Sequence, residues 1–216
     1  MSVCHHVSEE LIAEYAAGAL DEGWSLAIAT HLSLCGDCRG AAADFDAIGG
    51  ALLTALDVAP VHADALAACL ARLDDGPPAP AADANVAARC PVLPSPLASY
   101  AGGGLGAVRW RSVGGGVKQC KLPVKGAASA RLLWIPPGVA VPEHGHGGME
   151  LTLVLAGSFS DGAAAFHRGD IQEADVVVEH TPVSGPDEVC ICLAVTDAPL
   201  RFKRFLPRVV QRFAHI

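Results

Sequence analysis

The sequence lacks the features that mark several classes of protein. Only 18% of its 216 residues are charged and 5% are aromatic. No apolar run approaches the roughly eighteen residues that a membrane-spanning helix needs. The opening residues M-S-V-C-H-H do not form a basic segment followed by an apolar one, as a secretion signal would. We therefore expect a cytoplasmic protein with no membrane association.

What the chain does contain is enough apolar material for a folded core. Hydrophobic residues make up 51% of it, which excludes disorder throughout, and 216 residues suggest two modest domains. The 23 glycines and 15 prolines follow no collagen period and predict many turns. Eight cysteines without a secretion signal are more typical of metal ligands, redox thiols or small core residues than of a disulfide framework.

The negative charge is concentrated in the first part of the chain. Residues 1–80 hold 12 acidic and 2 basic side chains, a net charge of −10, whereas residues 81–216 are close to neutral at +2. Phosphate backbones favour clustered lysine and arginine, so this region is not expected to bind nucleic acid. An acidic surface favours a basic protein partner instead.

The spacing of hydrophobic residues divides the chain into a part predicted to be helical and a part predicted to form β-strands. Helical spacing predicts a first helix capped by Ser8, then helices over 22–34, 38–56 and 63–73, which we expect to form one compact unit. Six prolines between 77 and 96 indicate an extended linker. From residue 100 onward, short runs of alternating character separated by glycine and proline predict a β-sandwich or barrel. The expected organisation is therefore an all-α domain over 1–76, a linker rich in proline and alanine over 77–98, and an all-β domain over 99–216.

Four side chains in the helical part have the spacing of metal ligands. His31 and Cys35 are four residues apart on a predicted helix, and Cys38 follows across a Gly-Asp turn, so all three can converge. Mixed imidazole and thiolate ligands favour a structural zinc ion with four ligands. We take His6 as the fourth ligand, with His5 and Cys4 as neighbouring alternatives.

Two other interpretations of this cluster remain open. The C-x-x-C pair is also found in redox dithiols, but those occur in a βαβ setting that this helical segment lacks. Alternatively, His31 is a surface histidine and the cysteines fill the core. Zinc binding is favoured because three ligand positions at metal spacing seldom coincide by chance.

These residues carry a family resemblance. H-L-S-L-C-G-D-C resembles the H-x-x-x-C-x-x-C signature of zinc-binding anti-sigma factors, and nearly the whole chain is similar to the ChrR-type members. That resemblance implies a helical zinc-binding domain followed by a cupin-like domain. It also implies an alternative sigma factor, of the extracytoplasmic-function type, as the partner.

The second part of the chain contains a further set of candidate ligands. Residues 138–157 read G-V-A-V-P-E-H-G-H-G-G-M-E-L-T-L-V-L-A-G and resemble the first cupin motif at each specified position. His144 and His146 are two apart, so a strand would place them on one side, and a hairpin would return Glu150 to that side. Two imidazoles and a carboxylate suit a divalent metal, with zinc the expected ion and iron, manganese or nickel as alternatives.

The second cupin motif is degenerate. His180 fits its final ligand position, but the motif's P-x-G and its asparagine are absent. His167 is a rival ligand, although its place just before the Gly-Asp turn predicts that it is exposed. Cys190 and Cys192 share one face of an apolar strand, either as packed thiols or as redox groups near the metal.

Two functions of different classes account for these features. The first is an anti-sigma factor whose acidic zinc-containing helices sequester the sigma factor, with the cupin-like domain releasing it under oxidative stress from singlet oxygen or organic peroxides, as the resemblance implies. The second is a metal-dependent cupin enzyme, a dioxygenase or isomerase, with an accessory helical domain. A metal-buffering protein is a third, weaker interpretation. The acidic charge and the zinc motif favour the regulator.

Overall fold

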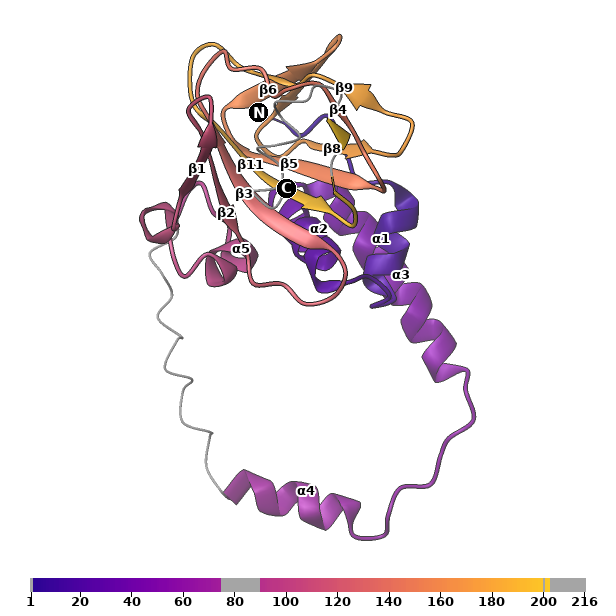
Figure 1. Cartoon of the computed structure of the whole chain (residues 1–216). Helices are drawn as coiled ribbons and strands as arrows, with labels where there is room; N and C mark the ends of the chain where they lie inside the picture. Colours follow the sequence, from indigo (N-terminus) through magenta and orange to yellow (C-terminus); the bar gives the residue numbers. More distant parts are fainter. Residues whose placement is uncertain (1, 75–89, 200, 203–216) are drawn as a thin grey trace.

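The computed structural model describes residues 2–74, 90–199 and 201–202 (Figure 1). It contains helices first and strands afterwards, which confirms the predicted fold class. Residues 77–89 of the predicted linker lie outside the described residues, as do residues 203–216. Within the described part, no helix combines the length and apolarity needed to cross a bilayer.

Three N-terminal helices pack together. They are α1 (Glu9–Ala16), α2 (Glu22–Leu34) and α3 (Gly36–Thr54). The first ends at Ala16, and Gly18, with a φ of +66°, turns the chain toward α2. The last begins two residues before the predicted start, with Cys35 as its N-cap, so the turn of the cysteine motif is also the start of a helix.

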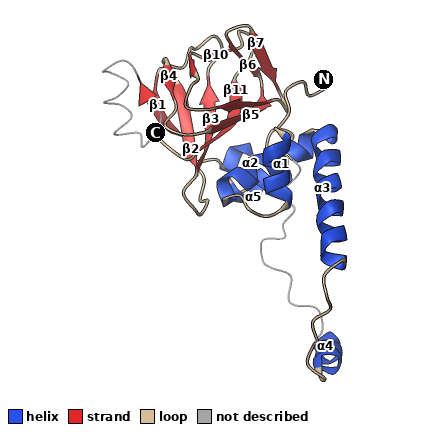
Figure 2. Cartoon of the chain, turned by 90° about the vertical axis from the view of Figure 1, so that its right-hand side faces the viewer, coloured by secondary structure: helices blue, strands red, loops and turns tan. Residues whose placement is uncertain are grey.

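Helix α4 (Ala65–Asp74) stands apart from these three, at the end of the extended segment that follows α3 (Figures 1 and 2). The expectation of one compact four-helix unit is therefore wrong at this helix. Its Leu66, Leu70 and Leu73 are spaced as on a core-facing helix, yet they are 71%, 52% and 73% exposed. The amphipathic pattern predicts the helix correctly, but it does not reveal what covers the apolar side.

A short helix, α5 (Ser95–Tyr100), follows residue 94, where the sequence predicts linker. Leu93 and Leu97 are 1% and 0% exposed and join the main core. Tyr100 donates its hydroxyl proton to Glu22 Oε1 at 2.7 Å. Residues 93–100 therefore fasten the β-domain to α2, and they are packed where an extended linker was expected.

The β-domain contains one large sheet and two small ones. The large sheet has the order β1-β2-β3-β11-β5-β8, and the small sheets have the orders β10-β6-β7 and β12-β4-β9. A single 3₁₀ turn, η1 (Leu105–Ala107), precedes them. The strands are β1 (Arg111–Gly114), β2 (Val117–Lys121), β3 (Ser129–Ile135), β4 (His144–Gly145), β5 (Glu150–Ala156), β6 (Ser158–Asp161), β7 (Ala164–His167), β8 (Ile171–Ala174), β9 (Glu179–His180), β10 (Val183–Ser184), β11 (Cys190–Thr196) and β12 (Arg201–Phe202). All the strand pairings are antiparallel, as the alternating pattern predicts.

Helix α2 lies on the large sheet and joins the two parts of the chain (Figure 2). Its apolar residues belong to one buried cluster with side chains of β3, β5 and β11. Ala27 and Ile28 are completely buried, and Trp24 is 8% exposed. Because α2 is covered by α1 and α3 on one side and by the sheet on the other, it is apolar around most of its circumference. The helical and β parts therefore share one core.

Candidate metal centres

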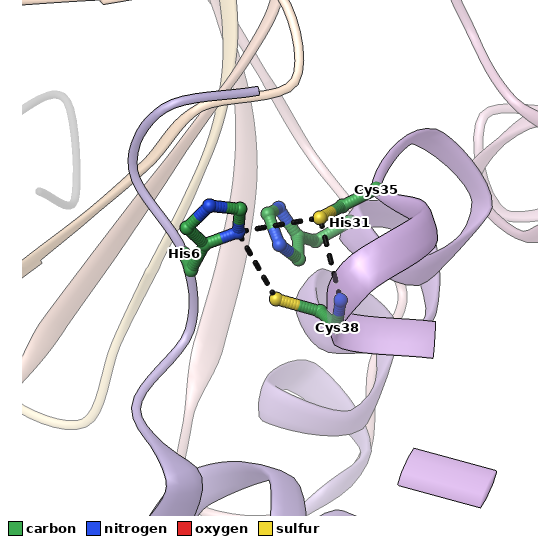
Figure 3. Close-up of side chains that lie close together, drawn as sticks. All are labelled: His6, His31, Cys35 and Cys38. Carbon is green, nitrogen blue, oxygen red and sulfur yellow. Dashed lines mark hydrogen bonds between the residues drawn. The ribbon is translucent and has the colours of Figure 1, made fainter. Parts of the chain in front are cut away.

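The four residues predicted as the first cluster come together between α1, α2 and α3 (Figure 3). His6 lies in the segment before α1, His31 in the last turn of α2, Cys35 between α2 and α3, and Cys38 in the first turn of α3. Their ligand atoms all lie within 4.8 Å of one another, and such a group can hold a metal ion. His31, Cys35 and Cys38 are buried, whereas His6 is exposed, so the cluster is open to solvent on the side of His6.

The separations in this cluster fit a tetrahedral ion. His6 Nδ1 is 3.3 Å from Cys35 Sγ and 3.5 Å from Cys38 Sγ. Zinc bonds of about 2.0–2.1 Å to nitrogen and about 2.3 Å to sulfur, at tetrahedral angles, place such atoms about 3.5 Å apart. The donor set and its spacing therefore match the ion that the sequence predicts.

His31 presents a free lone pair to this cluster. Its Nδ1 donates a hydrogen bond to the carbonyl of Gly169 at 2.9 Å, which leaves Nε2 as the acceptor of the neutral ring. That Nε2 atom is buried and has no hydrogen-bond partner among the described residues. Burial lowers the pKa of His31 to about 4, so the ring is neutral and can bind a metal near pH 7.

The thiols are placed to become ligands once an ion arrives. Burial raises the pKa of Cys38 to about 11, so the thiol keeps its proton when no cation is present. The Cys38 backbone N–H donates to Cys35 Sγ at 3.5 Å, at the N-terminus of α3, where a helix favours negative charge. Metal binding must therefore release protons and weaken as the pH falls.

The structure distinguishes between the two neighbouring histidines. His5 points away from the cluster and toward the β-domain, where its ring lies 4.3 Å from that of Phe166. Its Nδ1 is 3.5 Å from Asp170 Oδ2. His6 is the one that joins the cysteines, as the sequence analysis proposed, and exposed Cys4 is not part of the cluster.

A second cluster lies in the β-domain, where three histidines converge. Strand register places His144 directly opposite His180, and the Nε2 atoms of His144 and His146 each lie 3.1 Å from His180 Nε2. All three residues are buried, at 3%, 1% and 7% exposed. Nitrogen ligands about 2.1 Å from one ion lie roughly 3.0–3.4 Å apart, so this cluster can also hold a metal.

In two of these rings, Nδ1, the nitrogen that faces away from the centre of the cluster, is hydrogen-bonded to an acceptor. His144 Nδ1 lies 2.8 Å from the carbonyl of Pro142, and His180 Nδ1 lies 2.7 Å from Asp161 Oδ2. Such partners fix the ring tautomer and turn Nε2 toward the centre. Burial lowers the pKa of His144 to about 4 and lowers that of His146, so both rings are neutral near pH 7.

Glu150, the remaining predicted ligand, lies beside the three histidines without joining them. Its Oε2 is 3.7 Å from His146 Nδ1, and Thr152 donates to its Oε1 at 3.0 Å. Burial raises the pKa of Glu150. The structure thus brings three of the four predicted β-domain residues to one point. The rival His167 has a side chain 51% exposed and lies outside the cluster.

A cavity of about 80 Å³ is lined by His144 and His180 together with both apolar and polar side chains. Its polar lining includes Arg131 and Gln172, and Cys192 is on its wall. Cys190 Sγ lies 3.7 Å from Cys192 Sγ, and both residues are buried. The contact with Cys190 and burial raise the pKa of the Cys192 thiol, which favours packed, protonated thiols over reactive thiolates.

Three charged residues at these centres were missed by the sequence analysis. They are Arg131 at the cavity, Asp161 behind His180, and Asp170 next to the N-terminal segment. The only signal in the sequence was the Gly169–Asp170 pair, which was interpreted as a turn. Single acidic residues carry no spacing pattern that would identify such a role.

Comparison with known proteins identifies close relatives. A family model described as the ChrR cupin-like domain matches residues 103–199. The chain is 52% identical over 218 residues to the anti-sigma-E factor ChrR of Cereibacter sphaeroides, and the alignment covers 100% of both proteins. It also matches a crystal structure of Rhodobacter sphaeroides SigE in complex with the anti-sigma ChrR, with a TM-score of 0.81 and 49% identity. That match covers 91% of this chain and 100% of the other. Both relatives are regulators rather than enzymes.

Proposed function

The chain belongs to the ChrR family of anti-sigma factors, and we propose that it sequesters an alternative sigma factor of the extracytoplasmic-function type through its N-terminal helices. Membership of this family makes it a regulator and not a cupin enzyme. We also propose a cytoplasmic location, because the proposed partner acts with RNA polymerase.

The observation that carries this proposal is a set of exposed apolar side chains on α3, on α4 and at the turn that follows α3. We call it the α3–α4 surface; it consists of large side chains that are each more than half exposed, namely Ile48, Leu52, Leu53, Leu56, Leu66, Leu70 and Leu73. None of them belongs to either buried cluster of the described residues. Large apolar side chains left exposed together on one helix mark protein interaction sites, and an amphipathic helix without a partner is suited to a groove on another protein.

The charge around this surface indicates the chemistry of its partner. Five aspartates lie along the same stretch of chain, namely Asp44, Asp46, Asp57, Asp64 and Asp74. A basic partner with an apolar groove would satisfy both the leucines and the aspartates. The segment between α3 and α4 is exposed and has no regular structure, so the two helices can close on such a partner from different sides.

We propose zinc as the ion of the first cluster, with a structural role. It would join the segment before α1 to the end of α2 and the start of α3, through His6, His31, Cys35 and Cys38. A small helical unit has little core of its own, so metal binding can contribute much of its folding free energy. The three-histidine cluster would hold a second divalent ion, for which zinc is again our proposal.

Co-purification and transcription assays test the sigma-factor proposal. The full chain, expressed with an extracytoplasmic-function-type sigma factor, should form a one-to-one complex and suppress transcription by RNA polymerase that depends on this factor. The housekeeping sigma factor is the matched control and should be neither bound nor inhibited. If no complex forms with any alternative sigma factor and transcription is unchanged, the proposal fails.

We further propose that the β-domain controls release of the sigma factor under oxidative stress, from singlet oxygen or organic peroxides. Support comes from the family resemblance and from oxidisable side chains gathered in the β-domain: His144, His180 and Cys192 line one cavity, His146 lies in the same cluster as the two histidines, and Cys190 contacts Cys192. Oxidation or displacement of a ligand there would change the packing of the β-domain against α2.

A pair of histidine variants separates this sensing role from general damage. His144→Ala removes a member of the buried cluster, whereas His167→Ala alters an exposed histidine outside it. In cells producing singlet oxygen, the first variant should lose release of the sigma factor, and the second should respond as the wild type does. Normal release in His144→Ala would refute the proposal, and so would equal loss in both variants.

A further inference from the structure

The turn between β7 and β8 reaches from the β-domain to the N-terminal metal cluster. The carbonyl of Gly169 accepts the hydrogen bond from His31 Nδ1, at 2.9 Å. Gly169 has a φ of +97°, and a Cβ added there would lie 2.7 Å from a methyl carbon of Val3. Only glycine therefore lets the turn approach both the histidine and the N-terminal segment so closely.

Asp170, the next residue, holds the segment that carries His6. Its Oδ1 accepts the backbone N–H groups of Cys4 at 2.7 Å and of His5 at 3.0 Å. The backbone N–H of Ile171 in turn donates to the carbonyl of His5 at 3.2 Å. The two residues just before His6 are thus bound to the β-domain by three hydrogen bonds.

The same carboxylate is fixed within its own turn. Asp170 is 2% exposed, and its Oδ2 accepts the backbone N–H of His167 at 2.8 Å. Although burial alone would raise the pKa of Asp170, these backbone donors outweigh it, so the pKa is lowered and the group stays charged. A charged carboxylate that accepts three backbone N–H groups is a rigid anchor.

We propose that the Gly169–Asp170 turn is the outer shell of the N-terminal metal site, so that this site is shared between the helices and the β-domain. Gly169 orients His31, and Asp170 positions His6 through the backbone before it. Neither is a ligand; both are positioning residues. The inference rests on the metal site proposed above, and it goes beyond that proposal by assigning part of the site to the opposite domain.

Strand β8, which begins directly after the Gly169–Asp170 turn, also contacts a residue behind the three-histidine cluster. Gln172, on β8, donates its side-chain N–H to Asp161 Oδ2 at 2.7 Å, and that oxygen lies 2.7 Å from His180 Nδ1. A displacement of β8 would therefore change the hydrogen bonds that position residues of both metal clusters. This gives the proposed release of the sigma factor a physical route.

A matched variant separates an outer-shell role from ordinary domain packing. Asp21 also bridges the two parts of the chain, because its Oδ2 accepts the backbone N–H groups of Ala127 at 2.8 Å and of Ala128 at 3.3 Å. Within the described residues, Asp21 has no hydrogen bond to a member of either metal cluster. Asp170→Ala and Asp21→Ala thus each remove a carboxylate that bridges the domains, but only the first acts on the metal site.

The test uses Co²⁺ with the full chain prepared free of metal. A sulfur-to-cobalt charge-transfer band reports only the cluster with thiolates as its expected ligands, and competition with a chelator gives its Kd. Loss of an outer-shell partner typically costs 10–100-fold in metal affinity. We expect such a loss in Asp170→Ala and a change below about 3-fold in Asp21→Ala. Asp170→Asn keeps an oxygen for Cys4 and His5, so its Kd should lie between those of the wild type and Asp170→Ala.

A measurement on the wild type covers the case in which Asp170→Ala does not fold. In nitrogen NMR of the Zn²⁺-loaded chain, His31 should bind through Nε2 and keep a proton on Nδ1, directed at Gly169. Binding of His31 through Nδ1 would overturn the proposal, and so would equal Kd values in the two alanine variants. If the wild type shows no charge-transfer band at all, the metal site itself is refuted, which is a different outcome.

Discussion

Three leucines of α4 should contribute much of the affinity for the sigma factor and almost nothing to folding. The perturbation is the triple variant Leu66→Ala, Leu70→Ala and Leu73→Ala. At 71%, 52% and 73% exposed, these side chains together offer about the surface of two free leucines. Alanine is the best helix former, so α4 should retain its helical structure.

The expected loss of affinity follows from that surface. Fully burying a leucine side chain contributes about 1.5–3 kcal/mol. An alanine at the same position still buries its methyl group and so retains part of this contribution. The triple variant should therefore lose about 2–4 kcal/mol of binding free energy. Since 1.4 kcal/mol is a factor of ten, Kd should rise roughly 30- to 700-fold. Calorimetric titration with the purified sigma factor measures this directly.

A control on the β-domain makes the result specific. Val176 and Val177 are 59% and 80% exposed, so Val176→Ala and Val177→Ala remove exposed apolar surface far along the chain from α4. This double variant should bind as the wild type does. The argument for the α3–α4 surface is refuted if the leucine variant binds within about 3-fold of the wild type while circular dichroism shows intact helices.

Three other perturbations test the core and the two clusters. Ile28→Ala should lower the free energy of unfolding by about 2–5 kcal/mol in urea titrations, because this side chain is fully buried between α2 and the sheet. In the metal-free chain, His31 and His144 stay neutral down to about pH 4 while the unfolded chain takes up protons below about 6.5. Stability at pH 4 should therefore be lower than at pH 7 by about 3 kcal/mol for each, and a flat urea midpoint across this window would contradict it. Asp161→Ala should weaken metal binding at the three-histidine cluster about 10–100-fold by freeing the ring of His180, which chelator competition would show, and an unchanged Kd would argue against this role.

Local patterns in the sequence predicted most of the elements and the two clusters. Helical spacing identified α2 with its observed bounds, and the H-x-x-x-C-x-x-C spacing placed three of the residues that converge. These features depend on residues close together in the chain, where helix and strand geometry fix the direction of each side chain. The structure brings His6, and not His5, to the cysteines, a distinction that spacing alone does not make.

The arrangement of these elements depends on contacts that no local pattern encodes. Nothing in the spacing of α4 indicates that its apolar side stays exposed, because a core helix has the same pattern. The contacts of Asp170 with Cys4 and His5 span 166 and 165 positions in the sequence. They hold the start of the chain against the turn before β8, and only the folded arrangement of the whole chain brings these two segments together.

The central claim is that an ion held by His6, His31, Cys35 and Cys38 shapes the helices for binding. Titrating Zn²⁺ into the metal-free full chain, with fluorescently labelled sigma factor present, tests it most directly. Binding of the sigma factor should be weak at first and should strengthen as the thiolate cluster fills. Equal affinity of the metal-free and zinc-loaded chains for the sigma factor would contradict the claim.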